Sequence, residues 1–277
     1  MANRVNLKDK KVNATQLDEE ACGSLDSNGN LVNPATSDNQ TNGNQKVQPS
    51  WSTALDAFGR QRFSQPHTIL DITNKYGVDT LFSQTILTGA GTVTHLPNES
   101  SLSLNVGTTS GDKATRQSRQ YLHYDPLKSQ LVVMSRVFSP RKTNLLQRTG
   151  YYDVNDGLFF EDNGVNFAVV QRSSVSGSPV DTRIPQSSWN QDKLDGTGPS
   201  GIILDTAKAN IYWLDFEWLG VGPVRFGIWY KNQAIVCHVI ENENTLTTPY
   251  MKTGTLPLRT SIENNGTVAT PSNFKEI

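Results

Sequence analysis

Two carboxylates separated by a single residue, Asp215 and Glu217, have the spacing in this sequence that comes nearest to a catalytic pair. In an extended strand they would share one face and lie about 7 Å apart, because each residue rises by about 3.3–3.4 Å. That separation suits an inverting glycoside hydrolase, in which one carboxyl group protonates the leaving oxygen and the other activates water. Trp213 lies on the same face and could hold a sugar ring. A solvated sheet face explains the pattern more simply, and we favour that interpretation.

The histidines and cysteines show no pattern for a metal site or a nucleophile. The four histidines are His67, His95, His123 and His238, and none has another within metal-ligand spacing. Cys237 and His238 are neighbours in an apolar run, where strand alternation would send their side chains to opposite sides of the sheet. This geometry excludes a shared ion and a Cys–His pair. We therefore predict no catalytic, cofactor-binding or metal-ligating residues.

A loop between predicted strands is a candidate calcium site. Asp192 is followed by the run Asp195-Gly-Thr-Gly-Pro-Ser-Gly201. Carboxylates and turn carbonyls in a loop can coordinate calcium, although the spacing does not match an EF-hand. Because Asp-Gly also forms a simple tight turn, both interpretations stay open at this stage.

The glycines of Gly220-Val-Gly222 suggest dinucleotide binding, but the motif is incomplete. The third glycine of that fingerprint would fall at Arg225, and no helical pattern follows. We therefore reject this interpretation and predict no cofactor.

The charge balance argues against a nucleic-acid partner. The chain has 25 basic and 26 acidic residues, with a formal net charge of -1. Arg60 and Arg62 lie among the aromatic residues Phe58 and Phe63, but two arginines do not make a nucleic-acid footprint. A role in anchoring a loop is the simpler explanation.

The termini and cysteines indicate a protein made in a reducing compartment. Residues 1–11 are polar and basic, and no apolar run approaches the roughly 20 residues that span a bilayer, so we expect neither a secretory signal nor membrane insertion. Cys22 lies in a polar segment and Cys237 in an apolar strand. We expect two free thiols rather than a disulfide, which suits assembly in the cytosol.

Residues 1–50 differ in composition from the rest of the chain. They contain no Phe, Trp or Tyr, are rich in Asn and Gln, and carry turn pairs at Asn28-Gly29 and Asn42-Gly43. Such a segment buries too little apolar area to offset its backbone entropy. It is either a disordered leader or an arm that becomes ordered against a neighbouring subunit. We therefore divide the chain into a polar N-terminal arm (1–50) and one β-domain (51–277).

From Trp51 onward the sequence consists of short β-rich runs separated by turn residues. The runs that predict strands are His67–Ile72, Thr80–Leu87, Leu102–Val106, Arg116–Tyr124, Leu131–Phe138, Gly157–Glu161 and Asn166–Val170. The run from Arg116 could also be helical, and Leu131–Phe138 is typical of a buried strand. Asn163-Gly164 is a strong hairpin signal between the last two runs.

Three successive strands are predicted between Ile211 and Ile240. Along Ile211–Leu219 one face carries Tyr212, Leu214, Phe216 and Trp218, and the other is partly polar. Short connections make these strands an antiparallel meander with one apolar face, which a second sheet must cover. We therefore predict an all-β fold, an antiparallel β-sandwich of jelly-roll type, preceded by the extended arm.

Several segments, in conserved order, resemble a known family. Ala57-Phe-Gly-Arg-Gln-Arg-Phe-Ser64 is similar to the "AFGRLRVS" signature of phage virion structural proteins, although Gln61 and Phe63 replace aliphatic positions. The other matching segments are Thr68–Asp71, Leu104–Gly111, Gln147–Tyr151, Val170–Gly177, Ser188–Asn190, Leu194–Gly201, Glu217–Gly222, Thr255–Arg259 and Ile262–Asn264. The resemblance spans about residues 52–277. Similar proteins continue beyond Asn273–Ile277, which leaves open whether the natural chain is longer.

The resemblance implies a structural component of a tailed-bacteriophage virion, variously tail, fibre, baseplate or capsid-associated, assembled in the host cytoplasm. It implies no enzyme and carries no catalytic residues over. The expected partners are other virion proteins and further copies of the chain, with a trimer as our guess, because virion positions repeat. The alternative is a host-facing adhesin that binds a surface glycan, through exposed aromatics such as Trp213 or Trp229. A glycan depolymerase is a more distant third.

Overall fold

A computed structural model shows a chain of two units, Met1–Ser50 and Trp51–Ile277. The structure describes residues 24–25, 31–32, 56–58, 60, 67–126 and 128–277. In the first unit, β1 (Ser24–Leu25) pairs antiparallel with β2 (Leu31–Val32). The remainder of the expected arm, with Cys22, lies outside the described residues, so its role as an arm stays a prediction.

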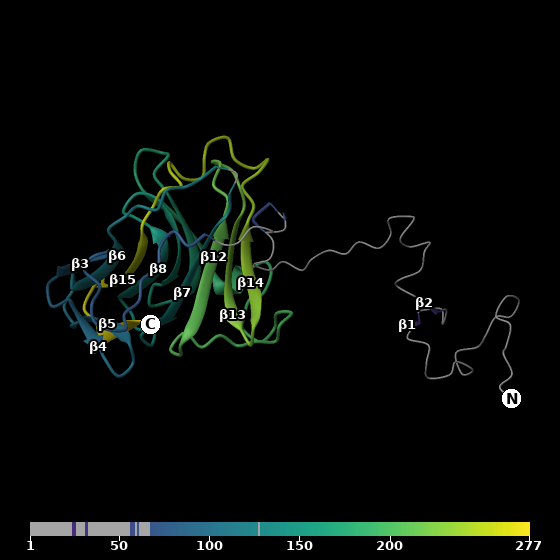
Figure 1. Cartoon of the computed structure of the whole chain (residues 1–277). Helices are drawn as coiled ribbons and strands as arrows, with labels where there is room; N and C mark the ends of the chain where they lie inside the picture. The colour runs from purple at the N-terminus through teal and green to yellow at the C-terminus, as the bar shows by residue number, and fades with distance from the viewer. Residues whose placement is uncertain (1–23, 26–30, 33–55, 59, 61–66, 127) are drawn as a thin grey trace, which may run out of the picture. The chain divides into compact units, whose positions relative to one another are not determined.

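The second unit is a β-sandwich of two seven-stranded sheets (Figure 1), which confirms the predicted fold class. In spatial order, sheet I contains β11 (Val180–Pro185), β10 (Phe167–Ser173), β9 (Gly157–Asp162), β8 (Leu145–Tyr152), β15 (Leu258–Asn264), β6 (Lys113–Ser118) and β3 (Ser83–Thr88). Sheet II contains β14 (Gln233–Ile240), β13 (Val224–Tyr230), β12 (Asn210–Phe216), β7 (Gln130–Val137), β16 (Ser272–Glu276), β5 (Ser101–Val106) and β4 (Thr92–Leu96). All of the described strand pairs are antiparallel, and a 3-10 turn, η2 (Gln186–Ser188), follows β11.

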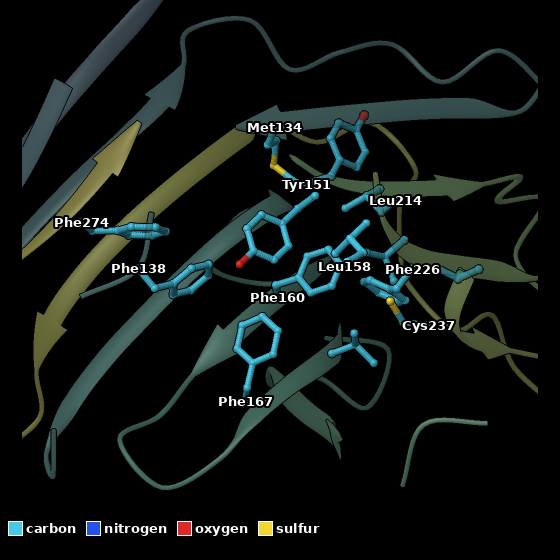
Figure 2. Close-up of a cluster of buried hydrophobic side chains, with 14 of the residues drawn as sticks. Met134, Phe138, Tyr151, Leu158, Phe160, Phe167, Leu214, Phe226, Cys237 and Phe274 are labelled. Atoms are coloured by element: carbon cyan, nitrogen blue, oxygen red, sulfur yellow. The ribbon is translucent and has the colours of Figure 1, made fainter. Parts of the chain in front are cut away.

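Aromatic side chains from both sheets meet between them (Figure 2). Phe160 of sheet I packs edge-on against Phe226 of sheet II, with ring centroids 5.4 Å apart. Phe138, just after β7, contacts Phe274 of β16 at 4.5 Å. Each of these four rings is at most 1% exposed. Burial of large rings from both inner faces provides most of the driving force that holds the sheets together.

The local turn signals place two of the predicted supersecondary units correctly. β9 and β10 form the hairpin predicted at Asn163-Gly164, where Gly164 adopts a positive φ of 82° and the side chain of Asn163 accepts the backbone N–H groups of Val165 and Asn166. β12, β13 and β14 form the predicted meander and lie side by side in green in Figure 1.

Two predicted strands near the start of the domain are wrong or misplaced. Residues 67–72 form no strand, and the next strand begins at Ser83 rather than Thr80. The carboxylate of Asp79 accepts the backbone N–H groups of Leu81 and Phe82, which holds a turn before β3. Side-chain capping therefore competes with strand pairing here, and the apolar composition alone could not reveal it.

Two further strands differ from expectation in extent or burial. The run from Arg116 is a strand, as favoured, but β6 begins at Lys113 and ends at Ser118. β7 is a strand as predicted, yet it is not buried on both faces, because Leu131 and Val133 are 38% and 50% exposed. The described residues of sheet II leave that part of its outer face open to solvent.

The side chains of Cys237 and His238 do not point to opposite sides of the sheet, contrary to the prediction from the sequence, because a β-bulge interrupts the alternation. The register shifts between Phe226 and Gly227, so that Gly227 lies opposite Val236 while Phe226 lies opposite His238. Cys237 is the extra residue and packs into the core, where burial raises the pKa of its thiol. The side chain of His238 accepts the backbone N–H of Asn190 at Nδ1, 3.1 Å away.

Stability should depend on pH through His238. Burial lowers the pKa of this histidine from 6.5 to about 4, so the unfolded chain binds the proton first. The free energy of unfolding is then at its full value above about pH 6.5 and falls by roughly 3 kcal/mol as the pH drops toward 4. Urea unfolding at several pH values should show this loss, and His238→Gln should flatten the curve in that window. An unchanged slope in the variant would assign the pH dependence to other groups.

Candidate functional site

The outer face of sheet II carries a buried ion pair at the end of β12. Asp215 accepts hydrogen bonds from the guanidinium of Arg225 on β13 and from the hydroxyl of Ser129. Both charged side chains are 0% exposed. An outer face is expected to be solvated, so another segment of the chain must cover this one.

Arg60 connects that face to the segment before the first strand of the sandwich. Its Nε lies 2.6 Å from the carboxylate of Asp56, and its Nη2 lies 2.7 Å from that of Glu217. Burial raises the pKa of Glu217 above its ordinary value, and the charge of Arg60 opposes this rise. Two segments of the family resemblance, at residues 57–64 and 217–222, therefore meet here. Residues 59 and 61–66 lie outside the described residues.

This cover corrects the expectations for Trp213, Asp215 and Glu217. All three are 0% exposed, so they are neither a solvated face nor a sugar platform. The Trp213 ring lies against Gly227, and Trp229 is partly buried beside it. Both carboxylates of the proposed inverting pair are engaged by arginines. The cause is non-local, since the covering residue Arg60 is 157 positions from Glu217.

The proposed calcium loop uses its carboxylates to fix its own backbone. Asp192 accepts the N–H groups of Leu194 and Ser200, and Asp195 accepts that of Thr197 together with its hydroxyl. Among the described residues, no group of three or more His, Cys, Asp or Glu side chains is arranged to hold a metal ion. The geometry is that of a capped turn.

The other motifs are structural as well. Gly220, with φ of 80°, forms the turn between β12 and β13, and no helix follows it. Within the described part of the chain, no helix is long and apolar enough to cross a bilayer.

The outer face of sheet I contains a different cluster, which we call the arginine face. It consists of Arg148, Arg172, Arg183, Arg259, Glu161, Asp181, Tyr152 and Phe159. The strand register brings these residues to one face. Arg183 lies opposite Val170, which in turn lies opposite Phe159. Phe159 lies opposite Gly150, which in turn lies opposite Arg259. Alternate positions on five neighbouring strands therefore point to the same surface.

Arginine side chains cover the two aromatic rings of this face. The guanidiniums of Arg148 and Arg172 lie 5.5 and 5.3 Å from the centre of the Phe159 ring, and that of Arg259 lies 5.4 Å from the Tyr152 ring. The rings are 0% and 2% exposed. Desolvated cation–π contacts of this kind hold the cationic groups in a fixed layer at the surface.

The carboxylates of the arginine face hold several arginines each. Glu161 is 2.7 Å from both Arg148 and Arg183, and Asp181 is 2.6 Å from both Arg172 and Arg183. Burial raises the pKa of Asp181, but the hydrogen bond and charge of Arg172, together with the other arginines, outweigh burial and leave the pKa below its ordinary value. Asp181 is therefore an ionised partner of the guanidiniums near neutral pH.

Positive charge is in excess on this face. Four guanidiniums face two carboxylates, and the Nε of Arg259 is buried without a hydrogen-bond partner among the described residues. Arg183 is 41% exposed at its side chain, so at least one guanidinium is open to a ligand. The arrangement can bind a carboxylate, sulfate or phosphate group through fixed, charge-assisted hydrogen bonds.

Sequence reasoning missed this cluster because its basic residues are scattered along the chain. The one local signal is alternation: Arg148 and Tyr152 are four residues apart on β8, and Phe159 and Glu161 are two apart on β9. Such spacing shows that residues share a face within a strand but not which strands are neighbours.

No protein-family model matches the chain, and no curated protein does. The resemblance to phage virion proteins therefore stays a prediction. Among solved structures, the chain is similar to a β-glucanase from Bacillus licheniformis, with 11% identity, a TM-score of 0.47, and coverage of 74% of this chain and 93% of that one. A family 16 glycosyl hydrolase from Mycobacterium smegmatis gives 10% identity, a TM-score of 0.47, and coverage of 73% and 92%.

The receptor binding domain of botulinum neurotoxin C/D mosaic serotype gives 14% identity and a TM-score of 0.45, over 75% of this chain and 46% of that one. At these identities the likeness describes the arrangement of strands alone.

These structures correct one expectation. The sequence predicted that the protein is not an enzyme, yet the solved structures that it resembles include glycoside hydrolases. The prediction of a non-catalytic protein is therefore withdrawn.

Proposed function

We propose that this protein is a component of a tailed-bacteriophage virion whose sandwich binds an acidic glycan on the host surface. The observation that carries the binding part is the surplus of guanidinium groups on the arginine face, fixed over two buried aromatic rings. The virion part rests on the resemblance at Ala57–Ser64 and the segments that follow it.

An acidic saccharide fits this surface better than the other anionic ligands. The aromatic rings are covered, which leaves no platform on which bases could stack. A polymer with carboxylate or sulfate groups at intervals would meet several guanidiniums on a rigid sheet, and each bidentate contact would add specificity.

Replacing Arg183 tests the glycan site. We expect Arg183→Ala to weaken binding of a polyuronic acid such as polygalacturonate by about tenfold, which corresponds to about 1.4 kcal/mol. The variant loses an exposed donor and also frees part of the negative charge of Glu161 and Asp181. Calorimetry or biolayer interferometry would measure the change.

The matched control is Arg119→Ala, an exposed arginine outside the arginine face, which should bind the polymer like the natural protein. Dextran, a neutral polymer, should not bind, and added salt should weaken binding of the acidic one. Equal loss in both variants, or equal affinity for both polymers, would contradict a specific site. Release of reducing ends during the same incubation would show whether the bound glycan is also cleaved.

A second candidate function, assembly with other copies of the chain, is favoured by the sheet edges. The edge of β14 is capped by Asn190, which bonds both the N–H and the C=O of Val239. The edge strand β11 contains two charged residues and Pro185, which discourage pairing. In contrast, β3 carries no charge, and its Ile86 and Leu87 are 43% and 48% exposed on opposite faces.

We infer that β3 pairs with β3 of a second copy. The N–H of Arg119 donates to the C=O of Phe82, so these two residues form a hydrogen-bonded pair at the start of the β3–β6 pairing. Because hydrogen-bonded and non-hydrogen-bonded pairs alternate in an antiparallel ladder, the backbone N–H and C=O groups of Thr85 and Leu87 point away from β6 toward the open edge. Antiparallel pairing of two neutral strands brings no like charges together. A contact between the same strand of two copies has two-fold symmetry and gives a closed dimer, in contrast to the trimer expected from the sequence.

Leu87→Lys should abolish this pairing, because an edge lysine blocks strand addition. Light scattering should give a dimer for the natural protein and a monomer for the variant. Val165→Lys, at the exposed tip of the β9–β10 hairpin, is the control and should remain dimeric. A monomeric natural protein at high concentration would refute self-pairing through β3.

A further inference from the structure

Three charged side chains lie inside the sandwich, between the two sheets. Arg116 comes from β6 of sheet I, whereas Arg136 and Glu276 come from β7 and β16 of sheet II, and they are 2%, 4% and 7% exposed. Each follows a core residue by two positions; the three core residues are Ala114, Met134 and Phe274. They therefore point inward by ordinary strand alternation.

The charges of this group do not balance. Glu276 is shared: one carboxylate oxygen lies 3.4 Å from Nε of Arg116, and the other lies 3.5 Å from Nη2 of Arg136. A guanidinium keeps its proton in proteins, so two positive charges face one negative charge. Burial lowers the pKa of Arg136, the charge of Glu276 opposes this, and the nearby charge of Arg116 adds to it. A buried surplus charge is costly unless another group compensates it.

The other N–H groups of Arg116 and Arg136 show which hydrogen-bond donor lacks an acceptor. Arg136 bonds the hydroxyls of Thr149 and Thr260 and the C=O of Ser135. Arg116 bonds the C=O of Asp79 through Nη1. Its Nη2 is buried and has no hydrogen-bond partner among the described residues.

A small cavity adjoins the unpaired donor. It has a volume of about 10 Å³ and is bounded by all three charged side chains and by Ser118 and Thr260. This is roughly the space needed for one particle the size of a water molecule. Its walls therefore combine a buried cationic donor, hydroxyl groups and a surplus of positive charge.

We propose that this cavity binds a single halide-sized anion, such as chloride, between Arg116 and Arg136. A water molecule would satisfy the donor but leave the positive charge uncompensated, and a monatomic anion is the most compact group that supplies both an acceptor and a negative charge. The anion neutralises the surplus charge and links β6 of sheet I to β7 and β16 of sheet II. The stability of the sandwich is then coupled to the halide concentration.

Two measurements on the full chain test this proposal. Crystals grown in sodium bromide should show an anomalous bromine peak within hydrogen-bond distance of Arg116 Nη2. Thermal unfolding in sodium chloride should give a Tm higher by about 3 °C or more than in sodium gluconate of equal ionic strength, because gluconate is too large to enter. No bromine peak, or equal Tm values in the two salts, would overturn the proposal.

Arg116→Gln provides the variant test, because it removes the surplus charge and leaves Arg136 paired with Glu276. Its Tm should no longer differ between the two salts. The control Arg119→Gln, an exposed arginine just after β6, should keep the full difference. A chloride effect that persists in Arg116→Gln would place the anion elsewhere. Should the variant fail to fold, the bromide crystals of the natural protein decide the question.

Discussion

Asp215→Ala is expected to lower the free energy of unfolding by about 3–5 kcal/mol. The substitution removes a carboxylate that is 0% exposed and holds both the guanidinium of Arg225 and the hydroxyl of Ser129. Arg225 would stay buried with its positive charge and without this partner, and a guanidinium cannot become neutral by losing a proton. Urea unfolding followed by tryptophan fluorescence would measure the loss.

The comparison with a surface pair separates burial from charge. Asp125 lies 3.5 Å from Lys128, and both side chains are more than half exposed. Asp125→Ala should therefore change stability by less than about 0.5 kcal/mol. The double variant Asp215→Leu with Arg225→Met removes both charges and should recover much of the loss. If Asp215→Ala costs no more than the surface variant, the buried pair does not hold this face together.

Strand alternation in the sequence predicts the two faces of β12 correctly but not which face meets solvent. Tyr212 and Leu214 lie in the core as predicted, and Trp213 and Asp215 lie on the other face. That second face is buried as well, in part by Arg60, which approaches from far away in the chain. Periodicity reports relative orientation within one strand, and it contains no information about a distant segment that packs on top.

The arginine face shows the same limit for a candidate site. Glu161 and Arg183 are 22 residues apart, and their contact depends on the register of β9, β10 and β11. Arg259 joins the face because β15 lies beside β8, a pairing between distant parts of the chain. Each residue alone looks like an ordinary surface charge. The bulge at Cys237 likewise follows from pairing with β13 and has no local signal.

Gly227→Val is expected to lower the free energy of unfolding by about 3 kcal/mol. A Cβ at this position would lie 2.2 Å from Cζ2 of Trp213 and 2.3 Å from the carbonyl oxygen of Ile235. Only glycine lets the indole approach β13 this closely at the point where the register shifts. Urea unfolding of the variant measures the cost, and the far-UV signal should show that the sheets are retained.

A double-mutant cycle with Trp213→Ala tests whether the indole is the reason for glycine. Without the ring, Gly227→Val loses its closest clash and should cost clearly less than in the natural protein. If Gly227→Val lowers the free energy of unfolding equally with and without the Trp213 ring, the carbonyl of Ile235 is the reason that glycine is needed. Trp213 lies two residues before Asp215 on the same strand face, and Gly227 lies two residues after Arg225. The ring therefore packs beside the buried ion pair and excludes water from it. Because glycine at 227 makes room for the ring, it also preserves the low-dielectric surroundings on which the ion pair depends.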